Sequence, residues 1–291
     1  MYHRVLPADD HRTRFEEPGM IVTPDTFALH LATLQQSNLE IVDLADWVKN
    51  RDAYAQQTCV AITFDDGWRD NFEFAFPLLQ ERKIPATIFA VEEHIGKCVQ
   101  FWPNRVAKLL LSEHRNEAFL DTLQEQLGRL PDEFNRESVS ALIQELKKFN
   151  DEQIYSWLAS IDDTDDSGRE MMSEEEFEQA LNKANIAIGS HTLSHCRLND
   201  FTEDSVLHDE VVISKKRLEA RFGKEIELFC FPNGDYSASA LDLVAQHYKA
   251  AVTTKRGHVD EFTPHELKRI GVHNDISDTK IKFKARMSGW V

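Results

Sequence analysis

The sequence predicts an α/β fold, and two observations support this prediction. Short apolar segments of strand length alternate with longer amphipathic segments over most of the 291 residues, which is the pattern of repeated βα units. One stretch, residues 97–182, has few strand formers and shows helical spacing instead. We therefore expect an αβ barrel or a doubly wound parallel sheet, built as a single domain over residues 1–291, with a mostly helical insertion at about 97–182.

The amino-terminal part supplies the first elements. Residues 1–20 are polar and rich in turn formers, so we expect a loop there. A helix should begin at Pro24 with Thr23 as its N-cap, because apolar residues recur at helical spacing beyond it. A short strand over 39–42 and a short helix over 43–49 follow.

The remaining elements repeat the order strand, helix, strand. A strand over 59–64, a helix over 77–83 and a strand over 86–91 fit one parallel βαβ unit of about thirty residues. Further strands are expected at 185–189, 228–231, 250–253 and 269–272. Helices are expected at 203–222, with Gly223 as the C-cap, and at 240–248.

The insertion contains an acidic run over residues 162–166. A calcium loop would place its acidic ligands at alternate positions and close on a glutamate in register, and this run does neither. We therefore interpret it as a solvated loop.

Composition and charge exclude several classes of partner. The net charge is −17 and there is no basic run, so we expect neither nucleic acid nor an anionic membrane surface as a partner. No segment approaches the roughly 18 consecutive apolar residues of a membrane span, and the first residues do not resemble a signal peptide. The four cysteines are scattered without a CxxC spacing, which favours free thiols in a reducing, cytoplasmic location. Nothing in the sequence indicates an oligomeric state.

Two adjacent carboxylates, Asp65 and Asp66, end the buried strand over 59–64 and precede Gly67. Adjacent strand residues point to opposite faces, but the twist into a loop can aim both carboxylates into one cleft. Acidic groups in such a place are costly unless a metal, a cation or a proton compensates them. An Asp-Gly turn without function is the alternative, and this segment alone does not exclude it.

Two histidines, His191 and His195, follow a second strand. Their spacing of four puts them on one face of a helical turn, where one metal ion can bridge them. If both clusters lie at the carboxyl end of a parallel barrel, two imidazoles and one carboxylate form a ligand set for a zinc-like ion with open positions. The second carboxylate is then free to act as a base. Two polar loop histidines without a metal are the alternative.

The motif TFDDG at 63–67, followed by HTLSH at 191–195, resembles the first two motifs of the polysaccharide deacetylase family (NodB homology, carbohydrate esterase family 4). The segment LFCFPNG at 228–234 resembles the third, an aromatic-Pro-x-Gly motif. The segment YHRV at 2–5 is similar to the amino-terminal part of bacterial members in surface-polysaccharide pathways. The resemblance implies a distorted (β/α) barrel, seven-stranded, that acts on a carbohydrate.

The resemblance also implies roles for individual residues. Asp65 would be the catalytic base, and the backbone N–H of Asn233 would polarise the acyl oxygen. Asp66, His191 and His195 would hold a divalent metal ion, zinc in many relatives. His273, which follows the last predicted strand, is the candidate for the general acid.

Departures from the family pattern leave the orientation of the base open. Many relatives carry an arginine just before the third motif, whereas Glu227 and Leu228 stand there in this chain. Arg269 could be a partner behind the site. His3 and Trp68 could line the cleft, although a tryptophan there could equally pack in the core.

We therefore expect a metal-dependent hydrolase that removes acetyl groups from N-acetylated amino sugars of a glycan or a glycan precursor. Two alternatives stay open. One is an amidohydrolase or O-deacetylase that acts on a different small substrate. The other is a carbohydrate-binding scaffold that has kept the fold and lost turnover.

Overall fold

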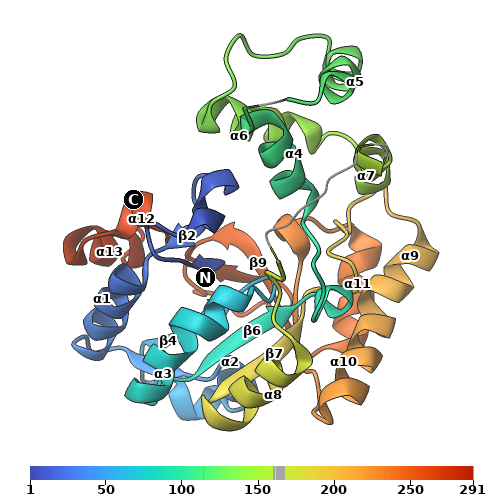
Figure 1. Ribbon diagram of the computed structural model, residues 1–291. Helices are drawn as coiled ribbons and strands as arrows, with labels where there is room; N and C mark the ends of the chain where they lie inside the picture. The colour runs from blue at the N-terminus through green and yellow to red at the C-terminus, as the bar shows by residue number, and fades with distance from the viewer. Residues whose placement is uncertain (114, 160, 162–167, 291) are drawn as a thin grey trace.

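The computed structural model describes residues 1–113, 115–159, 161 and 168–290, and its centre is a curled parallel sheet (Figure 1). Within these residues the sheet has six strands in the order β10-β9-β8-β7-β6-β5, and every neighbouring pair is parallel. The strands are β5 (Thr63–Phe64), β6 (Ala86–Ala90), β7 (Ile186–Ser190), β8 (Leu228–Cys230), β9 (Ala250–Arg256) and β10 (Leu267–Arg269). The predicted α/β fold is confirmed.

The first two residues close this sheet into a barrel. Tyr2 N–H donates to the carbonyl of Thr63 at 2.9 Å and the Tyr2 carbonyl accepts from Asp65 N–H at 3.0 Å. On the other side, Val272 N–H donates to the Met1 carbonyl at 3.2 Å. The amino-terminal segment is thus the seventh extended segment, between β5 and the residues that follow β10. The prediction of a loop over 1–20 is therefore wrong for these first residues. Their pairing is too short to produce a periodic pattern in the sequence.

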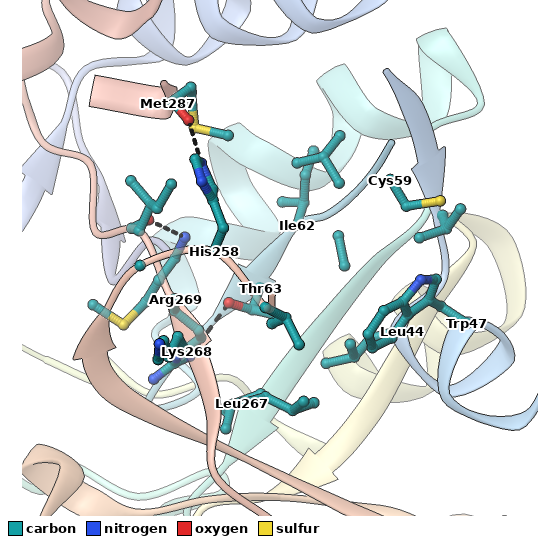
Figure 2. Close-up of a pocket in the computed structure, with 18 of the residues that line it drawn as sticks. Leu44, Trp47, Cys59, Ile62, Thr63, His258, Leu267, Lys268, Arg269 and Met287 are labelled. Carbon is teal, nitrogen blue, oxygen red and sulfur yellow. Dashed lines mark hydrogen bonds between the residues drawn. The ribbon is translucent and has the colours of Figure 1, made fainter. Parts of the chain in front are cut away.

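Two further pairs of short strands flank the barrel. Beyond Tyr2, β1 (Arg4–Val5) pairs in parallel with β2 (Ile21–Val22). The predicted strand over 59–64 divides at Ile62 into β4 (Cys59–Ala61) and β5, and β4 pairs with β3 (Glu40–Val42) rather than with the main sheet. The split leaves a cavity of about 480 Å³ between β4 and β10, lined by Leu44, Trp47, Leu267 and Arg269 among others (Figure 2).

Most predicted helices are present, and their capping residues explain where they begin. Thr23 caps α1 by accepting a hydrogen bond from Thr26 N–H, and Gly223 ends α10 with a left-handed φ of 61°. The predicted helix over 203–222 is α9, a π-helical turn η5 and α10 in succession. The helices of the barrel are α1 (Pro24–Gln35), α2 (Leu44–Lys49), α3 (Phe76–Arg82), α8 (Glu174–Lys183), α9 (Asp204–His208), η5 (Asp209–Ile213), α10 (Ser214–Phe222), α11 (Ala238–His247), α12 (Asn274–Ser277) and α13 (Lys280–Met287).

Shorter helical turns connect these elements, and the last two helices were not predicted. The turns are η1 (His11–Phe15), η2 (Arg51–Tyr54), the π-helical η3 (Asn71–Ala75), η4 (Glu92–His94) and η6 (Pro232–Gly234). Helix α13 lacks a long apolar stripe, because Phe283 is its one buried residue. Apolar residues therefore do not recur at helical spacing along α13, and the helix could not be predicted from such a pattern.

In its described residues, the predicted insertion is a separate lobe of four helices above the barrel (Figure 1). These are α4 (Trp102–Leu111), α5 (Glu117–Leu127), α6 (Arg136–Leu146) and α7 (Asp151–Ala159), and they share their own hydrophobic cluster. The predicted range of 97–182 is too wide, because α8 packs Phe177 and Ala180 into the barrel core. Helical periodicity alone cannot tell which core a helix joins. The acidic run at 162–166 lies outside the described residues, and the single-domain organisation stays a prediction.

Within the described part of the chain, no helix combines the length and the apolarity that a membrane crossing requires. The compartment expected from the sequence stays a prediction.

One buried histidine ties α1 to the closing segment. His30 is fully buried, its Nδ1 lies 3.1 Å from the Tyr2 hydroxyl, and its Nε2 lies 2.6 Å from the Ser277 carbonyl. Its ring stacks on Phe283 with 3.9 Å between ring centroids. Burial lowers the pKa of His30 from 6.5 to about 4, because the buried site disfavours the imidazolium.

This shift predicts an acid-dependent loss of stability. The unfolded chain takes up a proton on His30 near pH 6.5, whereas the folded chain does so only near pH 4. The contribution is complete above pH 6.5 and is lost as the pH falls to 4, by up to about 3 kcal/mol. Urea unfolding of His30→Gln across this range should show a shallower pH slope than the wild type. His11→Gln, at an exposed side chain, should keep the wild-type slope; equal slopes for His30→Gln and wild type would contradict the prediction.

Candidate active site

The two carboxylates at the end of β5 point into one site because the chain turns sharply between them. Asp66 has a φ of 74° and Gly67 a φ of 87°, both in the left-handed region. Thr192, His195 and Asn233 also have left-handed φ values, of 69°, 68° and 54°. Such conformations are costly for residues other than glycine. Their concentration here indicates that packing holds these loops in one arrangement.

Asp66, His191 and His195 meet as predicted, and their geometry fits a metal ion. The Asp66 Oδ1 atom lies 3.2 Å from His191 Nε2 and 3.4 Å from His195 Nε2, and the three ligand atoms lie within 4.8 Å of one another. Two ligands at zinc-like bond lengths and a tetrahedral angle are roughly 3.3 Å apart, so the spacing fits one ion. The donor set, one carboxylate and two imidazoles, is also of the kind that catalytic zinc sites use.

Partners behind these residues fix their orientation. His191 Nδ1 lies 2.8 Å from the Cys230 carbonyl. A carbonyl only accepts, so Nδ1 carries a proton and Nε2 is the ring nitrogen that faces Asp66. The other oxygen of Asp66 accepts from Trp68 Nε1 at 2.8 Å. Trp68 is therefore both a buried packing residue and a hydrogen-bond donor to the site.

The loop that carries the two histidines is not helical, which corrects the predicted helical turn. Residues 191–195 form a bend in which His195 N–H donates to Thr192 Oγ1 at 2.9 Å. Glu210, on η5, accepts from the backbone N–H groups of Leu193 and Ser194 at 2.9 Å each. Sequence analysis missed Glu210, because nothing in an amphipathic helix marks one glutamate as a loop anchor.

Arg269 on β10 orients the predicted base. Its guanidinium donates to both oxygens of Asp65 at 2.7 Å, and to the Thr253 carbonyl at 2.9 Å. Many relatives have an arginine just before the third motif that is oriented toward the base. In this chain Arg269 makes the contact with Asp65 instead. Figure 2 shows Arg269 beside Thr63, whose hydroxyl it reaches at 3.3 Å. Burial alone would raise the pKa of Asp65, but Arg269 outweighs it and the pKa is lowered, so the carboxylate is ionised at neutral pH.

The structure favours His3 over His273 as the histidine beside the base. His3 Nε2 lies 3.9 Å from Asp65 Oδ2, and its side chain is 21% exposed. His273 instead contacts Asp275 Oδ2 at 3.1 Å, and its ring packs against Gly19. Burial lowers the pKa of His3. The sequence offered His3 only as a residue that could line the cleft, and the pairing of Tyr2 with Thr63 is what brings it beside Asp65.

The turn at Asn233 presents a free backbone donor. Its φ of 54° lies in η6, where Gly234 follows and Thr254 Oγ1 donates to the Asn233 carbonyl at 3.0 Å. A Cβ at Gly234 would lie 2.0 Å from the Thr254 hydroxyl, so only glycine fits there. Among the described residues the Asn233 N–H has no hydrogen-bond partner.

A second set, Asp65, His191 and Cys230, also brings its donor atoms within 4.8 Å. Burial raises the pKa of the Cys230 thiol, and a thiol must ionise to bind a metal. Both Asp65 oxygens already accept from Arg269. The set that contains Asp66 therefore fits a metal ion better than the set that contains Cys230.

Comparison with known proteins gives a family from sequence and a matching fold from structure. A family model described as polysaccharide deacetylase matches residues 52–252. The Bacillus subtilis protein YxkH, provisionally named a polysaccharide deacetylase, is 21% identical over 260 residues. That match covers 88% of this chain and 64% of YxkH, so this chain spans less than two thirds of that relative.

Solved structures of deacetylases share the fold. The Streptococcus pyogenes deacetylase PplD, in complex with acetate, superposes with a TM-score of 0.62 at 17% identity, over 97% of this chain and 94% of PplD. BC0361, a polysaccharide deacetylase from Bacillus cereus, gives 0.64 at 16% identity over 99% of this chain and 67% of its own. IcaB from Ammonifex degensii gives 0.61 at 18% identity over 98% and 94%. At these identities the likeness supports the fold.

The contact between Arg269 and Asp65 predicts a strong effect on stability. Arg269→Gln leaves Asp65 as an uncompensated buried charge and should lower the free energy of unfolding by about 3 kcal/mol at neutral pH. Chemical denaturation measures this loss. Lys268→Gln, at the adjacent exposed position of β10, is the control and should stay within about 0.5 kcal/mol of the wild type. Equal stability of the two variants would show that the pair does not hold the site together.

Proposed function

This chain belongs to the polysaccharide deacetylase family, and we propose that it removes acetyl groups from N-acetylated amino sugars of a glycan or a glycan precursor. The family consists in general of metal-dependent hydrolases. The observation that carries the proposal is the division of labour between two adjacent carboxylates. Asp66 faces His191 and His195, whereas Asp65 faces Arg269.

We propose that a divalent ion, zinc for preference, is held by Asp66, His191 and His195. When bound, such an ion polarises the acetyl carbonyl and makes a water molecule more acidic. Asp65 accepts the proton of the attacking water, because Arg269 keeps this carboxylate ionised and fixed in direction. The Asn233 N–H donates to the acyl oxygen as negative charge develops on it.

The leaving amine of the sugar must take up a proton as the C–N bond breaks. We assign this proton transfer to His3, whose Nε2 lies 3.9 Å from Asp65 Oδ2 and whose side chain is partly exposed. His273, the residue expected from the sequence, stays a second candidate for the acid. It contacts Asp275, whereas His3 lies beside Asp65. An O-acetyl sugar or a small amide would pass through the same steps, so a substrate panel decides among these classes.

Replacing the two aspartates should separate their roles. Asp65→Asn should lower kcat for an N-acetylated sugar oligomer by about 10²–10⁴-fold, because the base is lost. The bound metal, measured by elemental analysis after reconstitution, should stay near one ion per chain. Asp66→Asn should lose the metal together with the activity. Full activity of Asp65→Asn, or full metal content of Asp66→Asn, would contradict the assignment.

The two candidate acids can be compared directly. His3→Gln should lower kcat by about 10²-fold, because the leaving amine no longer receives its proton. His273→Gln should stay close to the wild type. Steady-state kinetics with the same oligomer measures both variants. A large loss of kcat in His273→Gln, with little change of kcat in His3→Gln, would show that His273 is the general acid, as the sequence predicted.

A further inference from the structure

The turn between α6 and α7 of the helical insertion contacts two loops of the candidate site. One loop carries His195 and the other contains Asn233. Arg197, two residues after His195, is 2% exposed and donates into this turn. Its guanidinium reaches the Lys147 carbonyl at 2.8 Å and the Phe149 carbonyl at 2.6 Å. Its Nε donates to Asp151 Oδ1 at 2.9 Å. The metal-binding loop therefore holds the backbone of the insertion.

Helix chemistry explains why an arginine fits this place. Lys147 is the C-cap of α6, and the last carbonyls of a helix lack partners within the helix. A cation there also interacts favourably with the negative end of the helix dipole. Asp151 begins α7, where a carboxylate is favoured, and it also accepts from Trp102 Nε1 at 3.1 Å. One buried side chain thus satisfies carbonyls at the end of α6 and binds the carboxylate that begins α7.

The side chain of Lys147 runs in the opposite direction, from the insertion to the third motif. Its Nζ donates to Asn233 Oδ1 at 3.2 Å. Asn233 has a left-handed φ, and its N–H is the proposed donor to the acyl oxygen. Rotation of this peptide moves the N–H away from the acyl oxygen. A contact that holds the side chain therefore also holds the direction of the N–H.

We propose that Lys147 is a positioning residue: the insertion clamps the His195 loop through Arg197 and, through Lys147, holds the Asn233 turn in the conformation that binds the acyl oxygen. This inference rests on the proposed function. It gives the insertion a role in the chemical step. A lobe that served only to bind distant parts of the substrate would not need this contact.

Kinetics of Lys147 variants test the proposal with a matched control. Lys147→Met should lower kcat for an N-acetylated sugar oligomer by about tenfold, part of the 10²–10³-fold that loss of an oxyanion donor costs, and leave KM within about twofold. Lys147→Arg keeps the charge and the donors and should recover most of kcat. Lys148→Met, at the exposed neighbouring position, should match the wild type. A rise in KM at unchanged kcat in Lys147→Met would overturn the proposal.

A double-mutant cycle separates the contact with Asn233 from other effects of the charge, because Lys147 also interacts with Glu17 and Asp235. Asn233→Gly keeps the N–H, accepts the positive φ and removes Oδ1. In this background Lys147→Met should change kcat by less than about twofold. A tenfold loss in both backgrounds would show that Lys147 does not act through Asn233.

Amide hydrogen exchange gives a readout that does not need activity. Within the turn, Gly234 N–H donates to the Phe231 carbonyl and Asp235 N–H to the Pro232 carbonyl. Lys147→Met should accelerate exchange at these two amides and Lys148→Met should not. If the wild type does not deacetylate any sugar, the proposed function fails, and exchange still decides the positioning. Unchanged exchange in Lys147→Met would overturn it.

Discussion

Two carboxylates side by side at the end of a buried strand repel each other and lose their hydration, and much of the surrounding structure offsets that cost. Arg269 from the last strand neutralises Asp65 with two hydrogen bonds. His191 and His195, from the opposite part of the barrel, face Asp66. Each carboxylate therefore has its own compensating group, and the two cannot exchange roles without leaving one charge buried and unpaired.

Much of the fold could be predicted because its signals are local. Thr23 before Pro24 marks the start of a helix, and Gly223 marks the end of another, whatever the rest of the chain does. The Asp66 and His191 motifs were also found from sequence, because each is a short segment directly after an apolar strand. Their convergence followed from the rule that parallel strands end at the same edge of a sheet.

The contacts that could not be predicted join segments that are distant in sequence. Arg269 was offered by the sequence as a possible partner behind the site, but it meets Asp65 across 204 positions and no local pattern identifies that contact. His3 enters the site only because Tyr2 pairs with Thr63. The boundary of the insertion was misplaced for a related reason, since α8 has the same periodicity as the helices before it but packs on a different core. These are facts of tertiary packing, which periodicity does not encode.

The closure of the barrel by its first two residues also sets an order of assembly. Met1 bonds to Ile270 and Val272, so these two segments become neighbours only after residue 272 has been synthesised. Until then Asp65 lacks Arg269, and the amino-terminal segment that pairs with β5 has an open edge. Contacts of such long sequence separation form late and slowly. A chain that stops before residue 269 therefore contains Asp66, His191 and His195 but lacks the cation that fixes the direction of Asp65, so the proposed metal site and the proposed base depend on different lengths of chain.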